Sequence, residues 1–313
     1  MPHLKNEQNN KKMPNIPNLD ESVIAALNFF QKEKPVFPKK LFSKMPIIVG
    51  SGNAYHTAQA VFSDSPAIFA NESSFKAIVK NYQKLIKEKV ITEVLVISAS
   101  GEKDSIWELK LAKKLGLKTI LFTHTEKSTA TKIADVVYTF KKLPEPYTYN
   151  VSTYLGVMLA QDNGDAKKIH SFIKSLPFPK NFGNYKAYSF ILPDELAAIA
   201  PMLEIKKHEL FGPHLSIRAF SQGEARHAKF VIPWDQELVI SLGENKFFGK
   251  KEHRWQIKNK KKFNNSLTMA LCYFIIGKIQ ASQKSYFKNN INEYCAQGSL
   301  AYNKEKGFSV IVS

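Results

Sequence analysis

The sequence predicts an α/β protein with two units, each a mainly parallel β-sheet flanked by helices. In the first half, short apolar runs alternate with helical patterns, which is typical of a parallel sheet covered on both faces. A polar segment with two prolines, Pro177 and Pro179, then interrupts the alternation. After it, strand-like and helical segments resume with a less regular spacing. These three observations give the fold class and the division into two units.

The first unit contains a series of strand candidates, each followed by a helical pattern. The strand candidates are 47–50, 67–70, 94–97, 119–123 and 136–140. The helical segments after them are 53–62, 75–87, 104–115, 128–134 and 148–161. Ligands bind beyond the carboxyl ends of the strands in such sheets, so the loops at Gly50 and Ser98 are the expected place for a site.

The rest of the chain sets the expected domain boundaries. In the second half the strand candidates are 188–192 and 239–242, and the helical segments are 193–210 and 266–287. A further helix is predicted at 19–32, after a polar tail. The predicted organisation is a tail and helix at 1–34, a first domain at 35–161, a connector at 162–184 and a second domain at 185–313.

The composition is that of a globular protein. Hydrophobic residues make up 44% and charged residues 23% of the 313 residues. No apolar run reaches the roughly 18 residues of a membrane span, and the N-terminus lacks the apolar segment of a secretory signal. We therefore expect a cytoplasmic protein with no membrane partner. The two cysteines, Cys272 and Cys295, match no disulfide framework or metal-ligand spacing, so no metal is expected.

The charge balance points to an anionic partner. The net charge is +18, from 45 Lys and Arg against 27 Asp and Glu. Most of the excess is lysine spread along the chain, with the densest cluster at 258–262. A nucleic-acid site would be richer in arginine, with aromatic residues interleaved on one face. The pattern therefore favours a small phosphate-bearing ligand over nucleic acid.

Two loops join a buried strand to a helix and carry the candidate binding residues. In the segment 98–105, Ser98 and Ser100 offer hydroxyl donors, Gly101 lets the backbone approach closely, and Lys103 adds a positive charge. The alternative is a serine-rich turn that only caps the following helix. The second loop, 50–55, contains Gly50 and Gly52 without the third glycine of the dinucleotide fingerprint, so no nicotinamide cofactor is expected.

Together, these loops resemble the SIS (sugar isomerase) family, and most closely the isomerase half of glucosamine–fructose-6-phosphate aminotransferase. Segment 51–55 is similar to the family's Cys-Gly-Thr-Ser-Tyr, and segment 98–103 to its Ser-x-Ser-Gly-Glu-Thr. Segments 70–75, 151–154 and 223–227 resemble three more family motifs. The resemblance covers residues 45–280 and implies two SIS-type domains. The length also resembles that of the bifunctional phosphoglucose/phosphomannose isomerases. The sugar-phosphate ligands it implies are Ser51, Gly52, Asn53, Ser98, Ser100, Gly101, Lys103, Ser152 and Thr153.

The resemblance also implies the catalytic groups. Gly223-Glu224-Ala225-Arg226-His227 is similar to the family segment that carries a ring-opening histidine, which makes His227 the candidate. Segment 206–209 resembles the family's Lys-Leu-Lys-Glu, so Glu209 is the candidate base, with Lys206 beside it. Glu224 is a rival base. Because the family's histidine reaches the site from a neighbouring subunit, a homodimer is expected.

Several positions depart from the family pattern. Asn53 and Ala54 replace two hydroxyl residues, Lys103 replaces a threonine, and Tyr154 stands where the family has lysine. The family's C-terminal segment with its catalytic lysine has no recognisable match. The resemblance nevertheless implies a cofactor-free isomerase that interconverts the aldose and ketose forms of a hexose or hexosamine 6-phosphate. The alternatives are an amino-sugar-phosphate deaminase, an ammonia-dependent isomerase and a non-catalytic phosphosugar sensor.

Overall fold

The computed structural model describes residues 15–302 and 307–313. Its larger sheet is parallel throughout and has the order β2-β1-β3-β4-β5. The strands are β1 (Met45–Gly50), β2 (Ile68–Ala70), β3 (Ile91–Ile97), β4 (Lys118–Thr123) and β5 (Val136–Thr139). The intervening helices are α2 (Asn53–Val61), α3 (Phe75–Asn81), α4 (Gln83–Lys87), α5 (Asp104–Lys114) and the short η1 (Ala130–Lys132).

Helices cover both faces of this sheet, so its central strands are apolar on both sides. Val94 and Val96 of β3 pack with α3, α4 and α5, in a cluster that includes Leu109. Leu95 points the other way and packs with α2 and α6 (Val151–Asp162), in a cluster that includes Leu155. The alternation follows from the two-residue period of a strand. It explains why these strands read as continuous apolar runs in the sequence.

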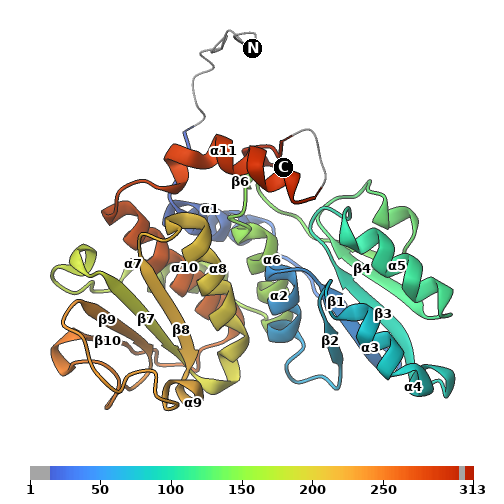
Figure 1. The fold of residues 1–313 in the computed structure, drawn as a ribbon, viewed down its shortest axis with the longest axis horizontal. Helices are drawn as coiled ribbons and strands as arrows, with labels where there is room; N and C mark the ends of the chain where they lie inside the picture. Colours follow the sequence, from blue (N-terminus) through green and yellow to red (C-terminus); the bar gives the residue numbers. More distant parts are fainter. Residues whose placement is uncertain (1–14, 303–306) are drawn as a thin grey trace, which may run out of the picture.

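The second sheet is smaller, also parallel, and has the order β10-β9-β7-β8. Its strands are β7 (Ala187–Leu192), β8 (Ser216–Ser221), β9 (Glu237–Leu242) and β10 (Arg254–Ile257). The helical segments around it are η2 (Phe182–Asn184), η3 (Asp194–Ile199), α8 (Ala200–Phe211), α9 (Gln222–Ala225), η4 (Lys251–His253) and α10 (Asn265–Ser282). In Figure 1 a layer of helices lies between the two sheets.

Helices from both ends of the chain join the two units. Helix α1 (Leu19–Lys32) packs against α10, α6 and the connector helix α7 (Ala166–Lys174). The approach of α1 to α10 is so close that a Cβ at Gly277 would lie 1.9 Å from the backbone nitrogen of Asp20. Lys278 forms a 2.8 Å ion pair with Asp20. One apolar core therefore runs from the larger sheet through the helices to the smaller sheet.

The C-terminal segment returns to the first unit. Helix α11 (Phe287–Leu300) crosses above the helical layer in Figure 1. Beyond it, β11 (Ile311–Val312) pairs antiparallel with β6 (Glu145–Pro146), just before α6. This short pair brings the end of the chain to the C-terminal edge of the larger sheet.

The predicted α/β class with two parallel sheets is confirmed, and so are all five strands of the first unit. The helix predicted at 75–87 is two helices, which separate at Tyr82. The helix predicted at 266–287 ends at Ser282. Strands β8 and β10 had not been predicted. The division of the chain at the residue numbers given above remains a prediction.

Candidate functional site

The two predicted loops lie side by side. Gly50, the last residue of β1, pairs in register with Ile97, the last residue of β3. The loops that begin at Ser51 and Ser98 therefore leave the same edge of the sheet from adjacent strands. This is the position where parallel α/β sheets bind ligands.

The serine loop is a tight turn that ends at the N-terminus of α5. Gly101 has φ +61°, and a Cβ there would lie 2.1 Å from the Ser128 hydroxyl oxygen. Ser98 Oγ accepts a hydrogen bond from the Gly101 N–H at 3.2 Å, and Ser100 Oγ accepts one from the Glu102 N–H at 3.3 Å. Because both hydroxyls act as acceptors within the loop, their O–H groups are available to donate to an anion.

The neighbouring loop contains an unusual buried amide. Gly52, with φ +53°, precedes α2, and Asn53 is the first residue of that helix. Asn53 is only 6% exposed, and its Oδ1 has no hydrogen-bond partner within the described part of the chain. A buried acceptor without a partner costs free energy. A ligand hydroxyl at this loop would satisfy it.

Ser152 and Thr153 lie at the N-terminus of α6, where Glu145 provides an internal anion. The Glu145 carboxylate accepts hydrogen bonds from the backbone N–H groups of Val151 and Ser152, both at 2.5 Å, and from the Ser152 hydroxyl. Burial raises the pKa of Glu145, and these hydrogen bonds act against the rise. The role of Ser152 and Thr153 as sugar ligands stays a prediction, since Ser152 already binds this carboxylate.

Lys206 and Glu209 form a buried ion pair on one face of α8. The Lys206 side chain is fully buried, and its Nζ donates to Glu209 Oε2 at 2.5 Å. The same Nζ donates to the backbone oxygen of Thr148 at 2.5 Å, and this contact places the pair beside the N-terminus of α6. Burial raises the pKa of Glu209, while the Lys206 ammonium acts to lower it. In the sequence, the signal for this pair was the similarity of segment 206–209 to the family's Lys-Leu-Lys-Glu.

The C-terminal segment contacts both the serine loop and the segment beside the ion pair. The Lys103 Nζ lies 3.9 Å from the ring centroid of Tyr302 and 4.2 Å from that of Phe308. Phe308 stacks on Tyr147, with centroids 4.9 Å apart and an interplanar angle of 26°. Tyr147 directly precedes Thr148, to which Lys206 is bonded. This chain of contacts brings Lys103 and the Lys206–Glu209 pair to one region.

Glu224 and His227 lie in and just after α9, apart from the Lys206–Glu209 pair on α8. Glu224 forms a capping box with Ser221: its carboxylate accepts from the Ser221 N–H at 2.9 Å, and its N–H donates to the Ser221 hydroxyl at 3.2 Å. His227 is exposed and lines a cavity of about 350 Å³ together with Glu224, Pro201 and Glu204. Glu209 does not line this cavity. Eight residues of α8 separate Pro201 from Glu209, a rise of about 12 Å.

One functional candidate, His124, was missed in the sequence. It follows β4 at the same edge, its N–H donates to Ala99 O of the serine loop at 3.0 Å, and its Nδ1 donates to Phe140 O at 2.8 Å. Burial lowers the pKa of His124 to about 4, so the ring is neutral at physiological pH. A polar residue directly after a predicted strand was the available signal.

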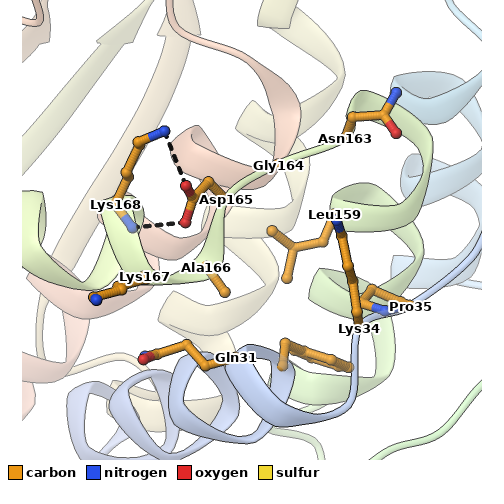
Figure 2. Close-up of a pocket in the computed structure, with 11 residues that line it drawn as sticks. Gln31, Lys34, Pro35, Leu159, Asn163, Gly164, Asp165, Ala166, Lys167 and Lys168 are labelled. Atoms are coloured by element: carbon orange, nitrogen blue, oxygen red, sulfur yellow. Dashed lines mark hydrogen bonds and ion pairs between the residues drawn. The ribbon is translucent and has the colours of Figure 1, made fainter.

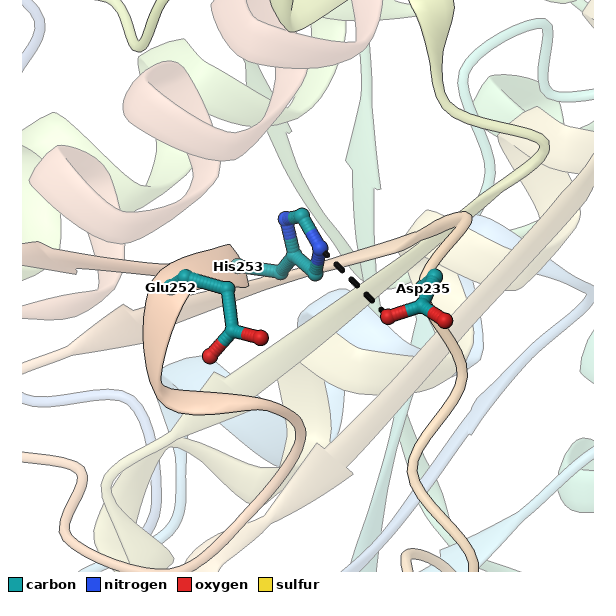
Figure 3. Close-up of side chains that lie close together, drawn as sticks. All are labelled: Asp235, Glu252 and His253. Atoms are coloured by element: carbon teal, nitrogen blue, oxygen red, sulfur yellow. Dashed lines mark ion pairs between the residues drawn. The ribbon is translucent and has the colours of Figure 1, made fainter.

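Two other features lie apart from these loops. A cavity of about 520 Å³ lies between the end of α1, the end of α6 and the start of α7, where Asp165 pairs with Lys168 (Figure 2). None of the predicted site residues lines it. Asp235, Glu252 and His253 lie before β9 and β10, with ligand atoms within 4.8 Å of one another (Figure 3). Asp235 is already paired with Lys250, so a cation there would compete with an ammonium group.

The fold is that of SIS domains. The C-terminal domain of glucosamine–fructose-6-phosphate aminotransferase from Francisella tularensis matches it with a TM-score of 0.57 at 13% identity, over 84% of this chain and 93% of that chain. Tagatose-6-phosphate ketose/aldose isomerase from Escherichia coli matches with a TM-score of 0.55 at 12% identity, over 84% and 90%. Glucosamine-6-phosphate deaminase from Thermotoga maritima matches with a TM-score of 0.54 at 13% identity, over 84% and 92%.

These similarities concern the fold alone. No family model matches the sequence, and no curated protein matches it either. Across residues 15–302 and 307–313, no helix combines the length and apolarity that crossing a membrane requires.

Proposed function

We propose that the protein binds a hexose or hexosamine 6-phosphate at the shared edge of β1 and β3 and isomerises it between aldose and ketose. The observation that carries the proposal is the buried Lys206–Glu209 pair, which is bonded to Thr148. The preceding residue, Tyr147, stacks on Phe308, and Phe308 contacts Lys103 of the serine loop. An anion-binding loop and a desolvated carboxylate in one region are the two parts that this reaction needs. The three neighbours named above share this fold and all have a sugar phosphate in their names, which supports the choice of ligand.

In this proposal the phosphate sits at the N-terminus of α5. Ser98 and Ser100 donate their hydroxyl protons, and the positive end of the α5 helix dipole faces the anion. Lys103 contributes charge from its position between the loop and the C-terminal aromatic rings. Asn53 accepts a hydrogen bond from a sugar hydroxyl.

Glu209 moves the proton between C1 and C2. It removes the proton from one carbon to give an enediolate and returns it to the other carbon, while the hydroxyl proton moves between O1 and O2 of the sugar. A carboxylate whose pKa is raised by burial is a stronger base than an ordinary one at neutral pH. Lys206 orients Glu209 and stabilises its charged form.

His227 opens the sugar ring, and it acts from a second copy of the chain. Within one chain, His227 lines a cavity with Pro201 near the start of α8, whereas Glu209 lies near the end of that helix and does not line the cavity. A homodimer in which the histidine of each copy faces the other copy's Glu209 would bring the two groups together.

Two other functions, a deaminase and a non-catalytic sensor, each have one observation in their favour. A deaminase is favoured by the similarity in fold to glucosamine-6-phosphate deaminase. A non-catalytic sensor is favoured by the departures at Asn53, Ala54 and Tyr154 from the family's motifs.

One experiment separates the three. The protein is incubated in deuterated water with fructose 6-phosphate or glucosamine 6-phosphate, with and without ammonia, and the products are followed by NMR. Isomerisation predicts deuterium at C2 without ammonia. Release of ammonia from glucosamine 6-phosphate identifies the deaminase. Binding without exchange or product identifies the sensor and refutes the proposed reaction.

A further inference from the structure

A cavity of about 520 Å³ lies where the ends of α1 and α6 meet the start of α7 (Figure 2). Sites for small molecules have volumes of about 300 to 1,000 Å³, so a compact ligand would fit. Ser152, a predicted sugar ligand, precedes Leu159 of the cavity by seven residues of α6, a rise of about 10 Å. The cavity is therefore a second candidate site, apart from the proposed sugar-phosphate site.

Tight packing fixes the walls of this cavity. A Cβ at Gly156 would lie 2.6 Å from the ring of Phe30, so α1 and α6 approach each other closely beside it. A Cβ at Gly164 would lie 2.5 Å from the hydroxyl oxygen of Ser266, and the same hydroxyl donates to Asp162 at 3.0 Å. The turn between α6 and α7 therefore has little freedom. The cavity is a fixed part of the fold rather than a gap beside a loose turn.

The side chains at the rim of the cavity carry an excess of positive charge. Three lysines line it, Lys34, Lys167 and Lys168, against one carboxylate, that of Asp165. Their formal charge is therefore +2. Lys168 pairs with Asp165 at 3.0 Å, whereas Lys34 and Lys167 form no ion pair with any residue of 15–302 or 307–313. Two ammonium groups without a carboxylate partner favour an anion, and lysine binds phosphate as a point charge.

The rest of the lining combines apolar surface with two amides. Three buried apolar residues line the cavity, Phe30, Leu159 and Ala166. Gln31 and Asn163 add primary amides, which have both donors and acceptors and so match the edge of a nucleobase. A bare phosphate would leave the apolar side unfilled, and a sugar phosphate would place hydroxyl groups against it at a cost in free energy. A phosphate joined to a flat ring suits both sides.

We propose that this cavity binds a nucleoside monophosphate, with the phosphate among the three lysines and the base on the apolar side. The phosphate of such a ligand carries a charge of about −2 at neutral pH, which matches the formal charge of the rim. The lining distinguishes neither purine from pyrimidine, so one nucleotide of each kind is tested. The site is independent of the proposed isomerase reaction, since it shares no residue with it.

Calorimetric titration of the full chain with AMP and with UMP tests the proposal. At least one of them should bind once per chain. Its nucleoside and inorganic phosphate should each bind at least about tenfold more weakly, because each lacks one half of the contact. Lys34→Glu and Lys167→Glu should each weaken nucleotide binding at least about tenfold, since each replaces an attraction to the phosphate by a repulsion. The matched control, Lys174→Glu, changes an exposed lysine at the end of α7 that does not line the cavity, and it should keep wild-type affinity.

Circular dichroism of each variant reports whether its fold is intact. No binding of either nucleotide at about 5 mM overturns the proposal, and so does an equal loss of affinity in Lys34→Glu and Lys174→Glu, which would show a general effect of charge. Displacement of the nucleotide by fructose 6-phosphate also overturns it, because the nucleotide would then occupy the serine loop. If the cavity variants alone weaken nucleotide binding while fructose 6-phosphate does not bind, the nucleotide site stands and only the proposed function fails.

Discussion

Replacing Glu108 by glutamine should remove much of the loss of stability that the protein suffers as pH rises. Glu108 lies in α5, the helix that begins at the serine loop, and it is 1% exposed. Its Oε1 has no hydrogen-bond partner within the described residues. Burial raises the pKa of Glu108 from its usual 4.5 to about 8, and the charges of Asp104 and Glu72 add to the rise. The folded protein therefore keeps this carboxyl protonated at neutral pH.

The size of the effect follows from the difference between the folded and unfolded pKa. Because the folded pKa is raised, the contribution of Glu108 to stability is complete below pH 4.5 and is lost as pH rises through 8. In that window the unfolded state releases a proton that the folded state retains. Each pH unit costs about 1.4 kcal/mol, so the loss between about pH 5 and pH 8 is at most about 4 kcal/mol.

Urea unfolding measured by circular dichroism at several pH values tests this. Glu108→Gln keeps the shape of the side chain and cannot ionise, so its stability should exceed that of wild type increasingly toward pH 8. Subtracting the unfolding free energy of wild type from that of the variant at each pH removes the contributions of all other titrating groups. One of these is His124, whose lowered pKa makes stability fall as pH drops below 6.5. Glu88→Gln, at a carboxylate with 51% side-chain exposure, is the control. Equal pH slopes for Glu108→Gln and wild type would refute the reasoning.

Three further predictions concern the proposed site. Ser100→Asp should abolish calorimetric binding of fructose 6-phosphate, since a fixed negative charge would face the phosphate, whereas Ser100→Ala should only weaken it; equal affinity of Ser100→Asp and wild type would remove the serine loop from the site. Glu209→Gln should lower kcat about 100- to 10,000-fold with little change in phosphosugar affinity, as checked by steady-state kinetics; full turnover in Glu209→Gln and its loss in Glu224→Gln would reassign the base. An equal mixture of inactive His227→Asn and Glu209→Gln chains should regain about a quarter of wild-type turnover after subunit exchange, because half of the dimers would hold one intact site; no recovery would place both groups within one chain.

The sequence predicted the secondary structure best where a short run of neighbouring residues is enough to identify the element. The strands of the larger sheet are buried on both faces, so runs such as Val94 to Ile97 identify them directly. Strand β8 was missed because it alternates buried and partly exposed residues around Arg218, whose side chain pairs with Glu237. The partly exposed positions hold both Arg218 and Phe220, and a serine is buried at the end, so polar and apolar residues do not alternate in the sequence as burial does in the structure. The separation of α3 from α4 at Tyr82 lacks a glycine or proline signal and was missed for the same reason.

For the candidate site, whose residues remain predictions, the limit of the sequence is the same. The serine loop and the Lys206–Glu209 spacing are local patterns, and the structure places both beside the C-terminal segment. The contact of Lys103 with Tyr302 and Phe308 joins residues about two hundred positions apart, and only the tertiary fold determines it. Glu145 was missed because its role at the start of α6 depends on the path of a turn rather than on its neighbours in sequence.

The packing of α1 on α10 has a consequence for how the chain folds during synthesis. The backbone N–H of Leu19 donates to the side-chain oxygen of Gln280 at 2.8 Å. At position 277 only glycine fits, because any Cβ there would collide with the backbone of Asp20. Helix α1 leaves the ribosome before α10, which is made more than two hundred residues later. During that interval the apolar face of α1, with Val23 and Leu27, has no native surface to cover it. The slow step of folding is therefore expected to be the docking of α10, and the larger sheet is expected to form before it.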